Sequence, residues 1–95
     1  MPEETSLRLD IWLWRARFFK TRALATAHVR GHSVRLSHLG QTRKTDKPGA
    51  LVVAGDVVTF GKAGRIYSIE VTGLGDRRGP AEEARALYRP LEADP

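Results

Sequence analysis

The sequence predicts an α+β fold in which two packed N-terminal helices lie against a small, mainly antiparallel sheet, with a short helix near the C-terminus. Apolar residues recur at helical spacing over residues 9–19. Over residues 65–72 they alternate with polar residues, as in a strand with one buried face. Further on, Pro80 precedes Glu82 and Glu83, which is typical of the first turn of a helix. With 95 residues, we expect one domain.

The first predicted helix, residues 9–19, has two apolar faces. One face consists of Leu9, Trp12, Leu13, Ala16 and Phe19, and the other of Ile11, Trp14 and Phe18. Both faces need to be covered, so we expect the C-terminal helix to fold back onto the second one. Arg8 and Arg15 fall on one seam between the faces, and Arg17 falls on the other.

A second helix follows directly. Thr21 is a good N-cap residue, so we expect this helix from about residue 22 to residue 30, with Gly31 as a left-handed residue after its end. Its inward residues are predicted to be Ala23, Leu24, Ala27 and Val29. Lys20, Thr21 and Arg22 form the turn between the helices, so the helix pair would present cations at one corner.

The remaining elements are short and are separated by glycine and proline. The expected strands are residues 33–36, 51–53, 57–60 and 65–72, and the last helix is residues 80–88 with Ala84, Leu87 and Tyr88 on its inner face. The turn-forming residues of segment 37–50 predict a loop or an irregular hairpin. The glycines of segment 73–79 predict a flexible connection. We expect Arg35 to point outward, on the side where the helix pair places its cations.

Positive charge is concentrated in the first half of the chain. Residues 8–47 hold ten Lys or Arg against two acids, whereas residues 48–95 hold six against seven, within a net charge of +5. Twelve of the sixteen cations are Arg, whose planar guanidinium binds phosphate and stacks on bases. A one-sided basic field favours a polyanionic partner such as nucleic acid.

Other kinds of function have less support. No apolar run is long enough to cross a bilayer, residues 1–7 lack the apolar core of a signal peptide, and the chain has no cysteine, so we expect a cytosolic protein. His28, His32 and His38 have no thiol or carboxylate close in sequence to complete a metal site. We therefore expect no metal and no cofactor.

Catalysis is not expected either. Asp10 stands alone among cations, and it is more simply an ion-pair partner of Arg22 or Arg35 than a general acid or base. The two tryptophans, Trp12 and Trp14, lie within an apolar pattern and are expected in the core rather than on a base-stacking surface.

Two helices joined by a cationic turn and followed by a small sheet resemble the S-four-like RNA-binding domain, also called the alpha-L motif. The residues that carry the resemblance, in the family's order and nearly its spacing, are Arg8, Leu9, Asp10, Leu13, Phe19, Lys20, Thr21, Arg22, Ala25, Gly31, Val34, Arg35, Leu36, Gly55 and Asp56. The resemblance implies the alpha-L RNA-binding fold over residues 7–72. We expect a disordered N-terminus over residues 1–6 and a C-terminal extension with a short helix over residues 73–95.

The same resemblance implies an RNA-binding surface. The residues transferred from the family are Arg8, Arg17, Lys20, Thr21, Arg22 and Arg35, and Arg43 and Lys44 are added because they are basic and nearby. Phosphates and RNA shape, rather than base sequence, would be recognised by such a surface.

Residues 12–14, 16–22 and 79–88 further resemble a ribosome-associated heat-shock branch of that family. This resemblance implies a non-catalytic protein that binds ribosomal RNA on the large ribosomal subunit. It also implies recycling of free large subunits that carry a nascent chain on tRNA. We further expect tRNA and, more weakly, DNA as partners, and a monomeric protein.

The chain departs from the family at its first turn, where Ser37-His38-Leu39-Gly40 replaces the usual Asn-Gly. We therefore expect the loop through Pro48 to be reorganised. Two other functions stay open. A helix-turn-helix DNA-binding protein would insert residues 22–30 into a major groove, and an RNA-recognition subunit of an rRNA-modifying enzyme would need a separate catalytic partner.

Overall fold

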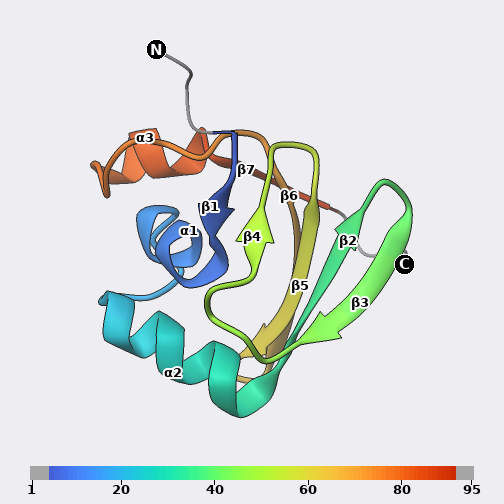
Figure 1. The fold of residues 1–95 in the computed structure, drawn as a ribbon. Helices are drawn as coiled ribbons and strands as arrows, with labels where there is room; N and C mark the ends of the chain where they lie inside the picture. Colours follow the sequence, from blue (N-terminus) through green and yellow to red (C-terminus); the bar gives the residue numbers. More distant parts are fainter. Residues whose placement is uncertain (1–4, 92–95) are drawn as a thin grey trace.

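A computed structural model describes residues 5–91 (Figure 1). Its helices are α1 (Leu9–Arg15), α2 (Arg22–His32) and α3 (Ala81–Arg85). Its strands are β1 (Leu7–Arg8), β2 (Val34–His38), β3 (Gln41–Thr45), β4 (Leu51–Val52), β5 (Val57–Lys62), β6 (Arg65–Val71) and β7 (Tyr88–Pro90). The predicted disorder of residues 1–6 falls mostly outside the described residues; of these six, only Thr5 and Ser6 are described, and they precede β1.

The fold is α+β, which confirms the predicted class. Five strands form an antiparallel sheet in the order β3-β2-β5-β6-β7, and β1 and β4 form a separate two-stranded antiparallel ribbon. Helices α1 and α2 pack against each other on one side of the sheet, and α3 lies beside α1 (Figure 1). None of the helices within residues 5–91 is long and apolar enough to cross a membrane.

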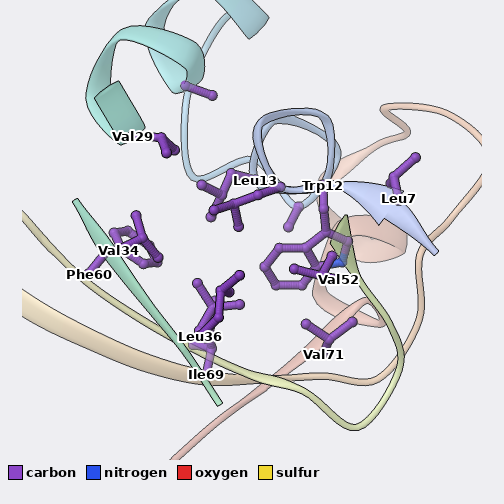
Figure 2. Packing of buried hydrophobic residues seen from close by; sticks show 14 of the residues in the cluster. Leu7, Trp12, Leu13, Val29, Val34, Leu36, Val52, Phe60, Ile69 and Val71 are labelled. Atoms are coloured by element: carbon purple, nitrogen blue, oxygen red, sulfur yellow. The ribbon is translucent and has the colours of Figure 1, made fainter. Parts of the chain in front are cut away.

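The core lies between α1 and the inner face of the sheet. Figure 2 shows Trp12 and Leu13 pointing from α1 toward strand residues such as Val52, Leu36 and Ile69. All five residues of the first predicted apolar face are buried, and the three residues of the second face are partly buried against the same core. Trp12 also donates a hydrogen bond from Nε1 to the Gly73 carbonyl, at 2.9 Å. The prediction that the tryptophans pack in the core is therefore confirmed for Trp12, whereas Trp14 is partly buried against the core.

Helix α1 ends at Arg15, so the prediction that it reaches residue 19 was wrong. The N–H of Phe18 donates to the Leu13 carbonyl and the N–H of Arg17 to the Trp14 carbonyl, both at 3.0 Å, which is the bonding pattern of a Schellman motif. Arg17 holds the left-handed position at φ 67°, where glycine is usual. This helix end could not be recognised from the residue types, because an arginine occupies the position where glycine is usual.

Helix α2 begins as predicted but runs two residues further. Thr21 caps it through a hydrogen bond from the Leu24 N–H to Oγ1, at 3.0 Å. Gly31 lies inside the helix, and Ser33 takes the positive φ of 59° instead, which corrects the predicted end. The buried residues are Ala25 and Val29; Ala23, Leu24 and Ala27 are exposed. Small apolar residues lie all around this helix, so periodicity alone did not identify its buried side.

Residues 37–50 contain a regular hairpin rather than a reorganised loop. Strands β2 and β3 pair from Val34↔Thr45 to His38↔Gln41, which leaves the two-residue turn Leu39-Gly40. Both turn residues have positive φ, 51° and 81°, as a type I′ turn requires. The expectation drawn from the missing Asn-Gly was therefore wrong: the turn geometry is kept, with leucine in the position where asparagine is favoured.

Replacing Leu39 with asparagine is expected to stabilise the protein by about 0.5–1 kcal/mol, because asparagine tolerates the left-handed conformation that strains leucine. The Leu39 side chain is 89% exposed, so no packing is lost. Denaturant unfolding measures the change as a higher midpoint at constant slope. Leu39→Ala removes the same side chain but keeps a strained residue, and it should not give the same gain. Equal midpoints for the two variants would contradict the explanation.

The C-terminal segment covers the second face of α1, as predicted, but with a different structure. Helix α3 ends at Arg85, and Tyr88 begins strand β7, which pairs with β6. The predicted helix over residues 80–88 was thus too long. Ala84 is buried as expected, and the Tyr88 ring lies 4.8 Å from the Phe18 ring, centre to centre. Leu87 is partly buried after the helix, and its carbonyl accepts hydrogen bonds from Thr72 and Gly73.

The connection over residues 73–79 is held against α1 rather than left flexible. Its carbonyl groups accept hydrogen bonds from Trp12, Arg15 and Arg17. In return, Arg78 donates from Nε to the Trp14 carbonyl at 3.1 Å, and its guanidinium lies 5.9 Å from the centre of the Trp14 ring. Glycines in this segment predicted flexibility, but side chains of α1 and of Arg17 just after it supply the donors that fix it.

Candidate nucleic-acid interface

A buried carboxylate links the start of α1 to the second turn of α2. Asp10 is fully buried, and it accepts hydrogen bonds from Arg8 Nε at 3.0 Å and from Arg8 Nη2 at 2.9 Å. Thr26 of α2 donates from its hydroxyl to Asp10 at 2.8 Å, and the Ile11 N–H donates at 2.8 Å. The predicted ion pair of Asp10 is therefore made with Arg8, not with Arg22 or Arg35. This network joins α1, α2 and β1 at one point.

The network keeps Asp10 ionised. Burial is the largest single influence and raises the pKa of Asp10, because it disfavours the charged carboxylate. The hydrogen bonds from Arg8, Thr26 and the Ile11 N–H, together with the charge of Arg8, outweigh burial and hold the pKa below its ordinary value. The same pairing raises the pKa of Arg8. Arg8 is thus a fixed cation whose side chain remains 47% exposed.

Asp10→Asn is expected to destabilise the protein by about 2 kcal/mol at neutral pH, because charge-assisted hydrogen bonds to a buried carboxylate are lost. The pKa of Asp10 is lower in the folded than in the unfolded chain. Its contribution is therefore present above the unfolded value of about 3.9 and disappears as the pH falls through the folded value. Denaturant unfolding from pH 7 to pH 2 measures this dependence.

The matched control is Asp46→Asn. Because Asp46 is exposed, this substitution is expected to change the free energy of unfolding by less than about 0.5 kcal/mol. If the difference in stability between wild type and Asp10→Asn stays constant over that pH range, the carboxylate does not act through its charge.

The cationic corner between the helices lies beside this network. Lys20 and Arg22 are exposed, and within residues 5–91 neither takes part in an ion pair. The Thr26 hydroxyl, which donates to Asp10, lies 2.9 Å from the Arg22 carbonyl one turn earlier. The backbone of Arg22 therefore lies close to the Asp10–Arg8 pair. Thr21 Oγ1 accepts the capping bond, and its O–H remains a donor for a phosphate oxygen.

Lys47 is a residue of this surface that sequence reasoning did not select. The loop over residues 46–50 packs on the start of α1, because Asp10 N donates to the Pro48 carbonyl and Leu9 N to the Ala50 carbonyl. Gly49 of this loop lies close to the Arg8 guanidinium. Lys47 is exposed on it. The Lys-Pro-Gly turn was a visible signal, but its approach to Arg8 is a long-range contact that spacing does not encode.

We call Arg8, Lys20, Thr21, Arg22 and Lys47 the helix-start surface. Its four cations come from the end of β1, from the turn before α2, from the first residue of α2, and from the loop after β3. Backbone N–H groups at the first turn of α2 add positive potential there. The arrangement can bind phosphates of a folded nucleic acid without reading bases.

Arg17 lies at the end of α1 and is turned toward the C-terminal segment. Its Nε donates to the Gly79 carbonyl at 2.7 Å, so it supports the fold at this point while its side chain remains exposed. The predicted grouping of Arg17 with Lys20 and Arg22 in one binding turn is therefore looser than expected.

The remaining predicted residues lie on two faces of the sheet. Val34 and Leu36 point inward, so Arg35 points to the face away from the helices, and its register partner Lys44 shares that face. Arg35 was expected on the side of the helix cations, and this was wrong because strand alternation directs it away from α1 and α2. Arg43 pairs with Leu36 and points to the inner side, where it lines a groove with Leu51.

Comparison with known proteins finds relatives named heat shock protein 15, although no protein-family model matches the chain. It is 37% identical over 94 residues to the heat shock protein 15 homolog of Aeromonas salmonicida, covering 97% of this chain and 67% of that one. It is 38% identical over 82 residues to heat shock protein 15 of Escherichia coli strain K12, covering 86% of this chain and 58% of that one.

A solved structure gives the same result. The trimeric structure of Vibrio cholerae heat shock protein 15 superposes with a TM-score of 0.77 at 38% identity, over 90% of this chain and 82% of that one. The chain spans about two thirds of the Aeromonas relative and less of the Escherichia coli relative. The similarity thus covers nearly all of this chain but leaves part of each relative without a counterpart.

Proposed function

The chain belongs to the heat shock protein 15 family, and we propose that it is a non-catalytic RNA-binding protein that attaches to ribosomal RNA on the large ribosomal subunit. The observation that carries the proposal is the helix-start surface, where the buried Asp10 fixes Arg8 beside the exposed cations of the α2 start. A surface of this kind binds phosphates in a defined geometry. The resemblance of residues 7–72 to the S-four-like RNA-binding domain supports the same partner.

We further propose that the protein acts in recycling free large subunits that carry a nascent chain on tRNA. This finer role rests on the resemblance of residues 12–14, 16–22 and 79–88 to the ribosome-associated branch of the family. A protein with this role needs affinity for RNA shape and for phosphates, and it needs no catalytic group of its own. Location in the cytosol, where ribosomes are found, belongs to the same proposal.

A titration at one fixed salt concentration of about 150 mM tests the proposal. Labelled protein is titrated with purified large subunits, small subunits, a structured RNA hairpin, tRNA and a DNA duplex of equal charge. We expect the order of affinity to be large subunits, then structured RNA and tRNA, then DNA. Equal affinity for the RNA hairpin and the DNA duplex would show a purely electrostatic binder and would contradict the proposal.

The two alternatives give different outcomes in the same titration. A helix-turn-helix protein would bind DNA best, but α2 is followed directly by the edge hairpin of the sheet, and its exposed start is the part joined to Asp10. An RNA-recognition subunit of a modifying enzyme would bind RNA without preferring whole subunits. Preference for large subunits separates the proposal from both.

The proposal includes an oligomeric state for the free protein. We expect a monomer, whereas the Vibrio cholerae relative has been solved as a trimer. Light scattering coupled to size exclusion, at protein concentrations from about 1 to 100 μM, distinguishes the two states. A trimer that persists over this range would replace the monomer in the proposed function and would multiply the phosphate contacts available to one particle.

A further inference from the structure

A column of aromatic rings runs from the core to the surface at the far end of α2. Phe19 is buried, His28 is half-buried and His32 is exposed. The centres of the Phe19 and His28 rings are 4.9 Å apart, and those of His28 and His32 are 4.4 Å apart with only 8° between the ring planes. Two imidazoles thus lie in parallel, and the outer one ends the column at the solvent.

The inner imidazole is fixed in place. His28 Nε2 lies 2.7 Å from the Gly61 carbonyl, so this nitrogen carries a proton and donates a hydrogen bond to the end of β5. Burial lowers the pKa of His28, and the nearby His32 and Lys62 lower it further against the opposing effect of the Gly61 bond. The bond to Gly61 therefore holds the His28 ring in place, and His32 stacks on it.

A basic hollow of about 490 Å³ opens beside the end of this column. It is lined by His28, His32 and the turn between β5 and β6, and none of the lining residues is acidic. Lys62 Nζ lies 5.5 Å from the centre of the Phe19 ring, and the Arg65 guanidinium carbon lies 5.4 Å from the centre of the Tyr67 ring. Aromatic rings thus hold both cations next to the hollow.

We propose that this hollow is a second RNA site, which binds one unpaired nucleotide with its base stacked on the exposed ring of His32 and its phosphates beside Lys62 and Arg65. Unpaired bases stack on exposed aromatic rings, and flanking cations bind the backbone. A metal is a poorer occupant, because the parallel imidazoles do not converge on one point and His28 Nε2 is already bonded to Gly61. The inference rests on the proposed RNA-binding function and deepens it.

The two sites lie at opposite ends of one helix. The helix-start surface includes Arg22, and the hollow includes His32, the first and last residues of α2. Ten residues of α-helix separate their backbones by roughly 15 Å. A folded RNA with a short single-stranded segment could therefore reach both, with its helical part at the start of α2 and an unpaired base at its end.

The test uses the intact protein and a single-stranded pentaadenylate RNA at about 50 mM salt. Proton NMR follows the imidazole resonances, which are expected to shift upfield for His32 because of the ring current of the stacked adenine. Affinity is compared among His32→Ala, His32→Tyr and His38→Ala, with folding of each variant checked by thermal unfolding. His38 is a matched control because it is an exposed histidine on β2 outside this hollow.

We expect His32→Ala to weaken pentaadenylate binding at least about fivefold, and His32→Tyr to retain it, since base stacking needs a ring. His38→Ala should have little effect. Equal losses for His32→Ala and His38→Ala, or no ring-current shift at His32, would overturn the proposed site. If the protein still binds large subunits through Lys20 and Arg22, the second site is wrong and the proposed function stands. If it binds neither pentaadenylate nor large subunits, the second site and the proposed function are both wrong.

Discussion

Replacing Lys20 and Arg22 together with glutamine is expected to weaken binding to large ribosomal subunits by about a hundredfold at near-physiological salt. Each phosphate contact contributes roughly tenfold near 0.1 M salt through release of counterions. With four cations on the helix-start surface, the slope of log affinity against log salt should be roughly −3.6 for the unchanged protein, and about two units flatter for the double variant. Affinities measured from about 50 to 200 mM salt give both slopes.

The matched control for this prediction is Arg85→Gln. Arg85 is an exposed arginine on α3, in the half of the chain where acids slightly outnumber cations. Replacing Arg35 and Lys44 together then measures how much the outer face of the sheet contributes to RNA affinity. Both residues were predicted to bind RNA, but they point away from the helices. If Arg85→Gln lowers affinity and slope as much as Arg22→Gln, binding is diffuse and the helix-start surface is not a site.

Removing residues 79–95 is expected to cost more than half of the stability of the protein. The deletion takes away strand β7, the Tyr88 ring against Phe18, and the carbonyl that Arg17 binds at Gly79. Small domains are stable by only about 5–15 kcal/mol, and the loss of a partly buried aromatic contact together with a paired strand removes several kcal/mol. Thermal unfolding should show a much lower midpoint. Tryptophan emission should shift to the red and become more accessible to quencher, because the Tyr88 ring that covers Phe18 beside Trp12 is lost.

Point variants keep this prediction informative if the truncated chain does not fold. Tyr88→Ala removes the ring beside Phe18 and is expected to cost about 2 kcal/mol. Arg89→Ala, in the same strand, removes an exposed ion pair with Glu70 and should cost less than about 1 kcal/mol. Unchanged melting and fluorescence in both the truncated chain and Tyr88→Ala would show that the segment is an appendage.

The fold class and the core face of α1 could be predicted from sequence because they depend on local periodicity. The spacing of Trp12, Leu13 and Ala16 requires one buried stripe whatever the partner is. The ends of elements were less predictable. Arg17 occupies a left-handed position normally marked by glycine, and Leu39 does the same in a hairpin turn. In both places tertiary contacts or strand pairing override the preference of the single residue.

The candidate site was predictable in part. Lys20, Thr21 and Arg22 lie at the exposed start of α2, as the cap and the charges indicated. The partner of Asp10 was not predictable from charge alone, since several arginines were candidates and the choice of Arg8 follows from the chain path at β1. The opposite directions of Arg43 and Lys44 follow from strand alternation, which was hidden while residues 37–50 were expected to be irregular.

The two edge strands of the five-stranded sheet affect how the protein aggregates. The edge strand β3 carries Arg43 and Lys44, and the other edge, β7, has three residues and includes Pro90, which has no N–H to donate. Charged side chains, short length and proline are the features that prevent an exposed strand from recruiting the strand of another molecule. Copies of this chain would therefore meet through side-chain surfaces, and concentrated solutions should resist growth of intermolecular β-structure from either sheet edge.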